Sequence, residues 1–295
     1  MTVIMAKITD NKVIANGVAD FHPDHIFDNG QCFRWVREAD GSYTGTAFRK
    51  VVNINYIDGQ IILENTSPED FEKIWRPYLD LDRDYGVIKN LLKEDDPVME
   101  QAITYGSGMR ILKQDCWETL ISFIISQNNN IPRIKKCIES LCRSHGELIG
   151  EYRGKIYYSF PSPETLAELP LSAIDPCRLG YRAGYILETA KKVAEDGGIR
   201  LALMEKEEPR EAFEYLLGFS GVGPKVANCI MLFSMGMYGS FPLDVWIKRV
   251  MNRLYHIKKD DINAMNAYAE QYFKGFGGIA QQYLFYYVRQ LDQII

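Results

Sequence analysis

The chain has 295 residues, and 34 Lys and Arg against 39 Asp and Glu give it a formal net charge of −5 at pH 7. Hydrophobic residues make up 46% and charged residues 25%, a globular composition that excludes a chain that is disordered, collagen-like or a coiled coil throughout. No apolar run approaches the ~20 residues that a membrane helix needs, so we expect no membrane partner. The acidic balance argues weakly against a nucleic-acid binder, because such domains are usually basic.

The cysteines and the first residues of the chain indicate the cellular compartment of the protein. The start of the chain lacks a basic segment followed by an apolar one, so no secretory signal is visible. The six cysteines are scattered and form no C-x-x-C pair, which argues against a zinc or iron–sulfur site. Dispersed free thiols fit a reducing compartment. We therefore expect an intracellular protein, in the cytoplasm or nucleoid of a bacterium or the nucleus of a eukaryote.

Strand patterns occupy residues 1–66. The clearest lie at residues 31–36, 43–48, 51–57 and 61–63. Asp40-Gly41 separates the first two of these, and Asp58-Gly59 separates the last two. An Asp-Gly pair between apolar runs favours a hairpin, because both turn residues take positive φ. We predict a small antiparallel sheet.

From residue 68 onward the apolar residues recur at helical spacing. Ile134, Cys137, Ile138 and Leu141 lie at i, i+3, i+4 and i+7, and similar faces occur within residues 120–125, 247–254 and 281–288. The predicted fold class is therefore α+β. An N-terminal antiparallel sheet domain with flanking helices would cover residues 1–112, and a mostly helical region would cover residues 113–295.

Charge is unevenly distributed along the chain. Residues 61–100 hold 5 basic and 11 acidic side chains, whereas residues 225–259 hold 6 basic and 1 acidic. Runs of charge are most often solvated helix faces, so this pattern alone assigns no function. It does remove the objection that the overall acidity raises against a nucleic-acid partner.

A glycine-rich turn separates two helical segments at residues 216–229. Gly221 and Gly223 permit a sharp turn and a close approach to another molecule, and Pro224 suits the first position of the second helix. The free N–H groups at that helix start favour an anion such as a phosphate. An ordinary corner between two helices is the alternative, and the glycines alone leave it open.

The whole run Gly-Val-Gly-Pro-Lys-Val-Ala at residues 221–227 resembles the helix-hairpin-helix motif of DNA glycosylases, whose hairpin holds the DNA backbone. The run Phe-Pro-Leu-Asp that ends at Asp244 resembles the loop and aspartate of the same superfamily, 19 positions after Lys225. Three further runs resemble 8-oxoguanine DNA glycosylases: Asn-Gly-Gln-Cys-Phe-Arg-Trp at 29–35, Asn-Asn-Asn-Ile-Pro-Arg at 128–133 and Gly-Tyr-Arg-Ala at 180–183. By this resemblance, which covers about residues 20–292, the sequence is identified as a member of the helix-hairpin-helix (HhH-GPD) superfamily.

The resemblance implies a bifunctional DNA glycosylase and abasic-site lyase, with Lys225 and Asp244 as catalytic residues. Breaking an N-glycosidic bond places positive charge on the sugar, which the carboxylate of Asp244 can stabilise. The amine of Lys225 can form a Schiff base if it is neutral. A place in the first helical turn and burial both disfavour the ammonium form. Asp244 also suits the N-cap of a helix that begins near Val245.

Base recognition is assigned by the same resemblance to four residues: Gly30, Cys229, Gln281 and Phe285. The carbonyl of Gly30 would accept the N7 hydrogen that 8-oxoguanine has and guanine lacks, and a side chain there would block the approach. Cys229 lies one helical turn after Lys225 and would contact one face of the extruded base. Gln281 would meet the base edge and Phe285 would stack on the ring. Without the family, Cys229 and Phe285 would be ordinary core residues.

By the same resemblance, four other residues would hold the opposite strand. Asn128 would fill the gap that the flipped base leaves, and Tyr181 would wedge beside the orphaned base. Arg133 and Arg182 would hydrogen-bond to an orphaned cytosine, so we expect excision from double-stranded DNA preferably opposite cytosine. Composition alone would make the three asparagines a polar loop. The resemblance also implies two helical subdomains with the site in the cleft between them, and a C-terminal helix that lines the base pocket.

Some features depart from the family or extend it. Trp246 stands where eukaryotic relatives carry a histidine, which puts in doubt a polar contact to phosphate at that position, and Cys116 stands where relatives have a proline. The four-cysteine cluster of endonuclease III relatives is absent, so we expect no iron–sulfur cofactor. The resemblance suggests a cation held by the backbone carbonyls of the hairpin residues, which are Leu217, Phe219 and Val222. We also expect a monomer.

Two other functions compete with this one. A glycosylase for alkylated purines or oxidised pyrimidines would share the hairpin, but Gly30 and the Gln281 and Phe285 pair argue against it. A DNA-binding module without enzymatic activity would use the hairpin for backbone contact only. Pure binding needs neither Lys225 nor Asp244 at this spacing.

Overall fold

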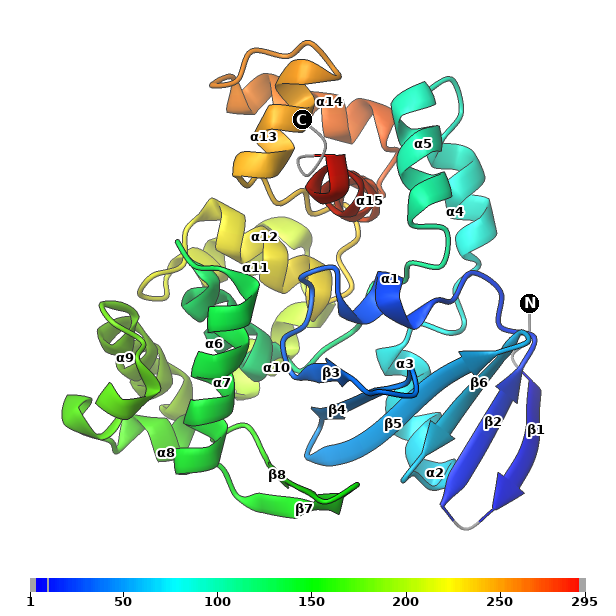
Figure 1. Ribbon diagram of the computed structural model, residues 1–295. Helices are drawn as coiled ribbons and strands as arrows, with labels where there is room; N and C mark the ends of the chain where they lie inside the picture. Colours follow the sequence, from blue (N-terminus) through cyan, green and yellow to red (C-terminus); the bar gives the residue numbers. More distant parts are fainter. Residues whose placement is uncertain (1–3, 10, 292–295) are drawn as a thin grey trace.

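An antiparallel sheet of six strands forms the N-terminal part of the molecule, in the order β1-β2-β6-β5-β4-β3 (Figure 1). The computed structural model describes residues 4–9 and 11–291. The strands are β1 (Ile4–Thr9), β2 (Lys12–Asn16), β3 (Trp35–Arg37), β4 (Tyr43–Ala47), β5 (Lys50–Ile57) and β6 (Gln60–Glu64). The predicted α+β class is confirmed.

The two predicted Asp-Gly turns are confirmed. Asp58 and Gly59 have φ of 49° and 79°, and they join β5 to β6 with Ile57 opposite Gln60. Gly41 has φ of 85° in the turn between β3 and β4. At Asp58-Gly59, positive φ at both central residues gives the turn the twist of the strands that it joins, whereas in the β3–β4 turn Gly41 has positive φ and Asp40 does not.

The strand predicted at residues 31–36 is shorter in the structure, where β3 begins at Trp35. The side chain of Gln31 is buried and bonds the backbone of residues far along the chain, including the N–H of Leu112 at 2.9 Å. Gln31 is thus held by side-chain hydrogen bonds in place of a ladder, and backbone bonding to β4 begins at the carbonyl of Arg34, which accepts from the N–H of Thr46 at 3.3 Å. Trp35 itself lies opposite Gly45, where an added Cβ would come within 2.2 Å of the indole ring, so only glycine fits.

Helices make up most of the rest of the chain (Figure 1). In the N-terminal part they are α1 (Pro23–Phe27), α2 (Pro68–Asp70), the π-helix η1 (Phe71–Trp75), α3 (Arg76–Tyr78), α4 (Tyr85–Leu92) and α5 (Pro97–Tyr105). They continue with α6 (Cys116–Ser126), α7 (Ile131–His145), α8 (Pro163–Ala167), the 3₁₀ turns η2 (Leu171–Ala173) and η3 (Asp175–Cys177), and α9 (Arg182–Ala194). The last are α10 (Ile199–Leu203), the 3₁₀ turn η4 (Met204–Lys206), α11 (Pro209–Leu217), α12 (Pro224–Phe233), α13 (Val245–Arg253), α14 (Ile262–Tyr272) and α15 (Gly277–Leu291). None of those in the described part of the chain is long and apolar enough to cross a membrane.

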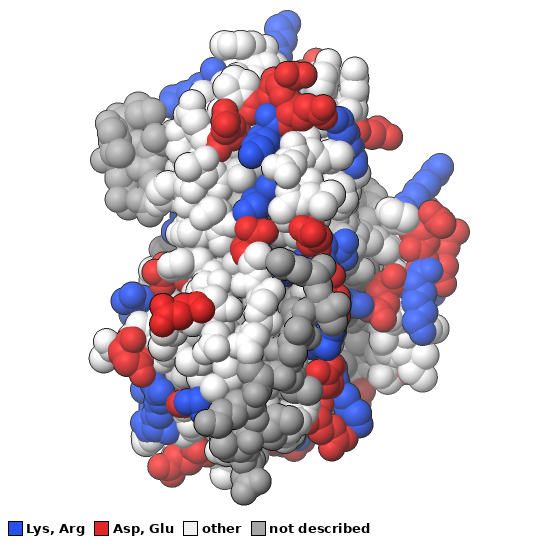
Figure 2. All heavy atoms as spheres, turned by 90° about the vertical axis from the view of Figure 1, so that its right-hand side faces the viewer, with Lys and Arg blue, Asp and Glu red and all other residues white. Residues whose placement is uncertain are grey.

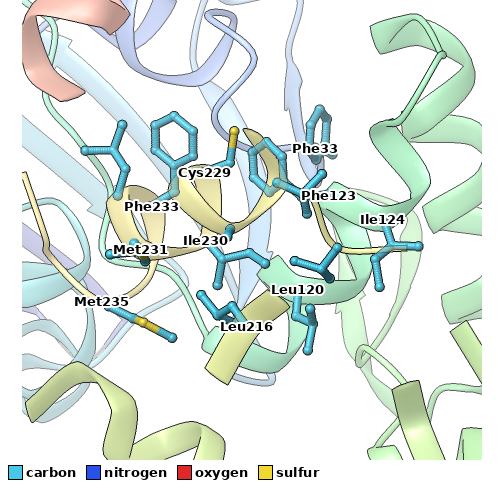
Figure 3. Close-up of a cluster of buried hydrophobic side chains, with 14 of the residues drawn as sticks. Phe33, Leu120, Phe123, Ile124, Leu216, Cys229, Ile230, Met231, Phe233 and Met235 are labelled. Atoms are coloured by element: carbon cyan, nitrogen blue, oxygen red, sulfur yellow. The ribbon is translucent and has the colours of Figure 1, made fainter. Parts of the chain in front are cut away.

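Helix α12 runs through the core of the helical region (Figure 3). Its side chains from Cys229 to Phe233 are all buried, as expected of a helix that is apolar on every side. Figure 3 shows Ile230 beside Leu216 of α11, with Leu120 of α6 close by. On its pocket side, Phe233 stacks on Phe123 at a centroid distance of 5.5 Å. The packing of the later residues of α12 in the core therefore fixes the position of its first turn, which carries Lys225.

The apolar core divides into two clusters at points that differ from the predicted domain boundary. Most buried apolar residues up to Leu81, together with Leu112, pack with the sheet, whereas Phe33 packs with the helical region. Residues 85–111, which include α4 and α5, pack with the helical region, and α5 lies along α15 (Figure 1). The domain boundary at residue 112 stays a prediction.

A small hairpin interrupts the helical region. Strands β7 (Leu148–Tyr152) and β8 (Lys155–Tyr158) pair only with each other among the described strands, and the sequence patterns did not predict them. Arg153 at the turn forms ion pairs of 2.9 Å with Asp40 and 3.3 Å with Glu64. The hairpin therefore connects the helical region to the sheet through charged side chains.

Candidate active site

A pocket of about 790 Å³ opens where the helical region meets the loop before β3. Its walls come from the loop that holds Gly30, the α6–α7 loop, the starts of α12 and α13, and α15. A smaller cavity of about 50 Å³ adjoins it and shares Gly30, Phe123, Lys225, Asp244 and Phe285 with it. The small cavity also includes Cys229 and Gln281. All six residues predicted for catalysis and base recognition thus line one cavity.

Lys225 lies in the first turn of α12, behind Pro224. The N-cap residue Gly223 supplies no side-chain cap, so the first N–H groups of α12 are open to an anion. The amine of Lys225 is 5.4 Å from the ring centre of Phe123. It also interacts with the thiol of Cys229, whose pKa is raised by burial. The amine is therefore held against an aromatic wall and above a buried thiol.

Asp244 is the N-cap of α13, as predicted, and its Oδ1 accepts a 2.8 Å hydrogen bond from the N–H of Ile247. Burial raises the pKa of Asp244, and the bond from Ile247 and the charge of Lys225 oppose that effect. The carboxylate therefore stands in a poorly solvated place beside the amine. Such a place strengthens its interaction with any positive charge that develops nearby.

The predicted base-recognition residues come from three elements. Cys229 of α12 and Gln281 of α15 are buried, and Phe285, one turn after Gln281, is half-buried. The Oε1 of Gln281 is buried without a hydrogen-bond partner in the described structure. An orphaned acceptor of this kind is costly unless a ligand satisfies it.

Gly30 has φ of +85°, a conformation that side chains other than glycine rarely adopt. An added Cβ would lie 3.4 Å from Cε1 of Phe285, an ordinary contact. Within the protein, the need for glycine therefore comes from the backbone conformation.

Of the four residues predicted to hold the opposite strand, Asn128 lines the pocket, whereas Arg133, Tyr181 and Arg182 do not. Asn128, in the α6–α7 loop, is exposed and has φ of 46°. Tyr181 is 55% exposed just before α9, and its ring meets that of Tyr185 edge-on at 5.9 Å. Arg133 is exposed and donates to the carbonyl of Arg178 at 3.4 Å.

Arg182, in contrast, is buried. Its guanidinium donates to the carbonyls of Gln127, of Asn128 at 3.0 Å and of Leu179 at 3.2 Å. These bonds fix the backbone around Asn128 to the start of α9. The predicted contact of Arg182 with a cytosine requires either the second N–H of Nη1 or the exchange of one of these bonds.

The hairpin turn is attached to the same loop. Gly221 has φ of 77°, and an added Cβ would lie 2.6 Å from Cδ2 of Tyr185. The carbonyl of Gly221 accepts a 2.7 Å hydrogen bond from the side-chain amide of Gln127. Hairpin, Asn128 loop and Tyr181 therefore form one connected surface.

The cation predicted at the carbonyls of Leu217, Phe219 and Val222 stays a prediction, and the structure shows which contacts surround these groups. The carbonyl of Phe219 accepts the N–H of Val222 at 3.1 Å. The ammonium of Lys192 donates to the carbonyl of Gly218 at 2.7 Å and stands 5.0 Å from the ring centre of Phe219. The carboxyl end of α11 thus already interacts with a positive charge. Across the described residues, no group of three or more His, Cys, Asp or Glu side chains could hold a metal.

Several residues of the pocket had no predicted role: Phe33, Phe123, Trp246, Lys248 and Arg289. The guanidinium of Arg289 lies 5.5 Å from the ring centre of Phe285, one turn earlier on α15. The spacing of four residues on one helix face could have indicated this contact. The approach of Phe123 to Lys225 depends on how α6 packs on α12, which no local pattern reveals.

Comparison with known proteins is consistent with this geometry. The model of the 8-oxoguanine DNA glycosylase N-terminal domain matches residues 13–120, and that of the HhH-GPD superfamily base excision DNA repair proteins matches residues 121–274. An N-glycosylase/DNA lyase of Saccharomyces cerevisiae is 41% identical over 160 residues, which are 51% of this chain and 43% of that protein. The N-glycosylase/DNA lyase OGG1 of Arabidopsis thaliana is 33% identical over 230 residues, 75% of this chain and 63% of that protein.

A solved structure matches the whole fold. The 8-oxoguanine glycosylase/lyase of Clostridium acetobutylicum, in complex with double-stranded DNA containing cytosine opposite 8-oxoguanine, is 41% identical with a TM-score of 0.94. The match covers 99% of this chain and 100% of that one. The chain belongs to the HhH-GPD superfamily of base excision DNA repair proteins and, within it, to the 8-oxoguanine DNA glycosylases.

Proposed function

We propose that the protein removes 8-oxoguanine from double-stranded DNA, preferably opposite cytosine, and then cleaves the strand at the abasic site, acting as a monomer. One observation carries the proposal. The amine of Lys225, the carboxylate of Asp244 and the four base-recognition residues line a single cavity. The glycosylase/lyase activity in the names of the relatives supports the same reaction.

The reaction follows from the positions of these groups. A base turned out of the duplex enters between Phe285 and Cys229. The amine of Lys225 attacks C1′ of the sugar as the bond from C1′ to the base nitrogen breaks, and the base leaves with that electron pair and takes up a proton. Asp244 stabilises the positive charge that the sugar carries meanwhile. Ring opening gives the Schiff base, and β-elimination then breaks the C3′–O bond.

Recognition of the opposite base rests on Arg133 and Arg182. The exposed guanidinium of Arg133 can reach the acceptors of a cytosine directly. Arg182 joins it by exchanging one of its bonds to the carbonyls of Gln127 or Asn128 for a cytosine acceptor. Asn128 and Tyr181 fill the space that the extruded nucleotide leaves.

Reductive trapping tests the covalent step. Borohydride added to the wild-type protein and a duplex with 8-oxoguanine opposite cytosine should leave a covalent protein–DNA adduct, and the Lys225→Gln variant should give none. Lys259→Gln, an exposed lysine outside the pocket, serves as the matched control and should trap as the wild type does. An undiminished adduct with Lys225→Gln, or none with wild type, contradicts the mechanism.

Lesion preference separates this function from its nearest alternative. Excision should be measured on duplexes with 8-oxoguanine, an alkylated purine or an oxidised pyrimidine, and then with each of the four bases opposite 8-oxoguanine. We expect 8-oxoguanine opposite cytosine to be the best substrate. Equal or faster excision of the other lesions would assign the protein to a different substrate.

A further inference from the structure

Two buried side-chain amides hold the backbone on either side of Gly30. The carbonyl of Asn29 accepts a 2.9 Å hydrogen bond from Nε2 of Gln282, and the N–H of Gln31 donates to Oδ1 of Asn29 at 3.1 Å. Asn29 is 0% and Gln282 2% exposed. The peptide planes before and after Gly30 are thus each fixed by a side chain that water does not reach.

The second of these bonds sets the direction of the Gly30 carbonyl. That carbonyl and the N–H of Gln31 belong to one planar trans peptide, so they point in opposite directions. An N–H held by Asn29 therefore turns the carbonyl away from Asn29. The Asn29 side chain is itself fixed, because its Nδ2 donates to the carbonyl of His25 at 2.7 Å.

The backbone at Gly30 needs these two hydrogen bonds because a glycine is conformationally free. Gly30, at φ of +85°, has little intrinsic preference between alternative backbone conformations. Without the two bonds, its carbonyl would be free to sample several directions. With them, one conformation is selected before any ligand arrives.

Helix α15 connects this support to the rest of the pocket. Gln281 and Gln282 both line the small cavity, and the side chain of Gln282 also bonds the carbonyl of Asn29. Successive side chains on a helix point about 100° apart, so one rigid element serves the base edge and the Gly30 loop together. Any movement of α15 would displace both recognition groups.

We propose that Asn29 and Gln282 are positioning residues that aim the Gly30 carbonyl at the base and so set recognition of the N7 hydrogen. This inference rests on the proposed function, in which Gly30 accepts that hydrogen. A misdirected carbonyl loses the attraction to an N7–H donor and also the repulsion from the N7 lone pair of guanine. Neither residue has a part in the chemistry at Lys225, so cleavage of a preformed abasic site, which has no base to recognise, should not depend on them.

The test compares base-dependent with base-independent activity in three variants. Gln282→Met keeps length but removes the donor, and Asn29→Ala removes the acceptor. Asn53→Ala is the control: Asn53 is equally buried and donates to Ser42 and Thr44 within the sheet, away from the pocket. Single-turnover excision of 8-oxoguanine, cleavage at a preformed abasic site and the melting temperature are measured for each.

Both pocket variants should excise 8-oxoguanine about tenfold more slowly, as expected when one buried hydrogen bond is weakened. Their cleavage of the abasic site should stay within about twofold of wild type, and Asn53→Ala should leave the ratio of the two rates unchanged. A parallel fall in both rates, or no fall in excision, overturns the proposal. If one pocket variant fails to fold, the other decides by the same ratio. A wild type that cleaves abasic DNA but leaves 8-oxoguanine in place would instead overturn the proposed function and this inference with it.

Discussion

Asp244 combines a structural and a chemical role in one side chain. Its Oδ1 caps α13 through the N–H of Ile247, and its charge lies in the cavity beside Lys225. Asparagine is as good an N-cap as aspartate but carries no charge. The two roles can therefore be separated by one substitution.

For Asp244→Asn we expect excision to slow by about 100- to 1,000-fold, the cost of removing a preorganised electrostatic partner. The free energy of unfolding should change by less than about 0.5 kcal/mol, because the cap is kept. Single-turnover excision and urea unfolding measure the two effects. Asp244→Ala, the comparison variant, should lose activity and about 1 kcal/mol of stability together. Near wild-type excision by Asp244→Asn would show that the charge is not needed.

His25 makes stability depend on pH. Burial, followed by the neighbouring ring of His22, lowers its pKa from 6.5 to about 4, while the charge of Asp24 opposes this. Its Nδ1 accepts a 3.1 Å bond from the N–H of Gly108, which a protonated ring could not do. The folded state therefore favours the neutral ring, and this stabilisation is complete above pH 6.5 and is lost as the pH falls toward 4.

We expect the free energy of unfolding to decrease between pH 7.5 and 5.5, by about 1 kcal/mol or less because His25 is only partly buried. His25→Asn, which keeps an acceptor but does not titrate, should show a smaller decrease over the same interval. Urea denaturation at several pH values gives the comparison. Identical pH profiles for the two proteins would exclude His25 as the source.

Prediction from sequence succeeded best for residues whose role is local. The Asp58-Gly59 turn and the Asp244 cap depend on neighbours within three residues, and both are confirmed. The burial of Arg182 was not foreseen, because its partners at residues 127 and 128 lie more than fifty positions away. Phe123 was missed for the same reason.

At the scale of elements, the hairpin depends on two glycines in different ways. Gly221 has φ of 77° and no room for a Cβ beside Tyr185. Gly223 has φ of −99°, and an added Cβ there would meet no atom within 4 Å. Substitution of Gly223 therefore serves as the control for substitution of Gly221.

Gly221→Ala should lower the free energy of unfolding by about 2 kcal/mol, whereas Gly223→Ala should change it by less than about 0.5 kcal/mol. Because Gly221 is bonded to Gln127, its displacement should also weaken DNA binding. Thermal unfolding and titration with a lesion duplex measure both effects. Equal stability of the two variants would contradict the geometry. A loss of affinity in Gly223→Ala without loss of stability would show close approach of DNA at that residue.

Elements were predictable where the apolar pattern matched a buried face. The face of α7 around Ile138 is confirmed by burial. The β7–β8 hairpin escaped prediction because its residues are exposed or half-buried, so that no apolar alternation marks it. Its Arg153-Gly154 turn, with φ of 50° and 72°, was the available signal.

At the scale of the molecule, the net charge of the chain does not describe each part of its surface. Figure 2 shows acidic and basic side chains intermingled on the side that lies to the right in Figure 1, where α4 and α5 are found. Ion pairs such as Lys274 with Glu94, at 2.7 Å, balance part of that acidity. The pocket, with Lys225, Lys248 and Arg289, opens between other elements. The net charge of −5 therefore says little about the surface that would meet DNA.

The division of the apolar core has a consequence for recombining this protein with its relatives. Residues 85–111 pack with α15 and the other C-terminal helices. They therefore belong to the same packing unit as the second half of the chain, although they precede it in sequence. A chimera joined near residue 112 would place α5 of one parent against α15 of another. Crossovers that respect the packing lie between Leu81 and Tyr85, so exchange of the sheet alone should be tolerated where exchange of a whole N-terminal half is not.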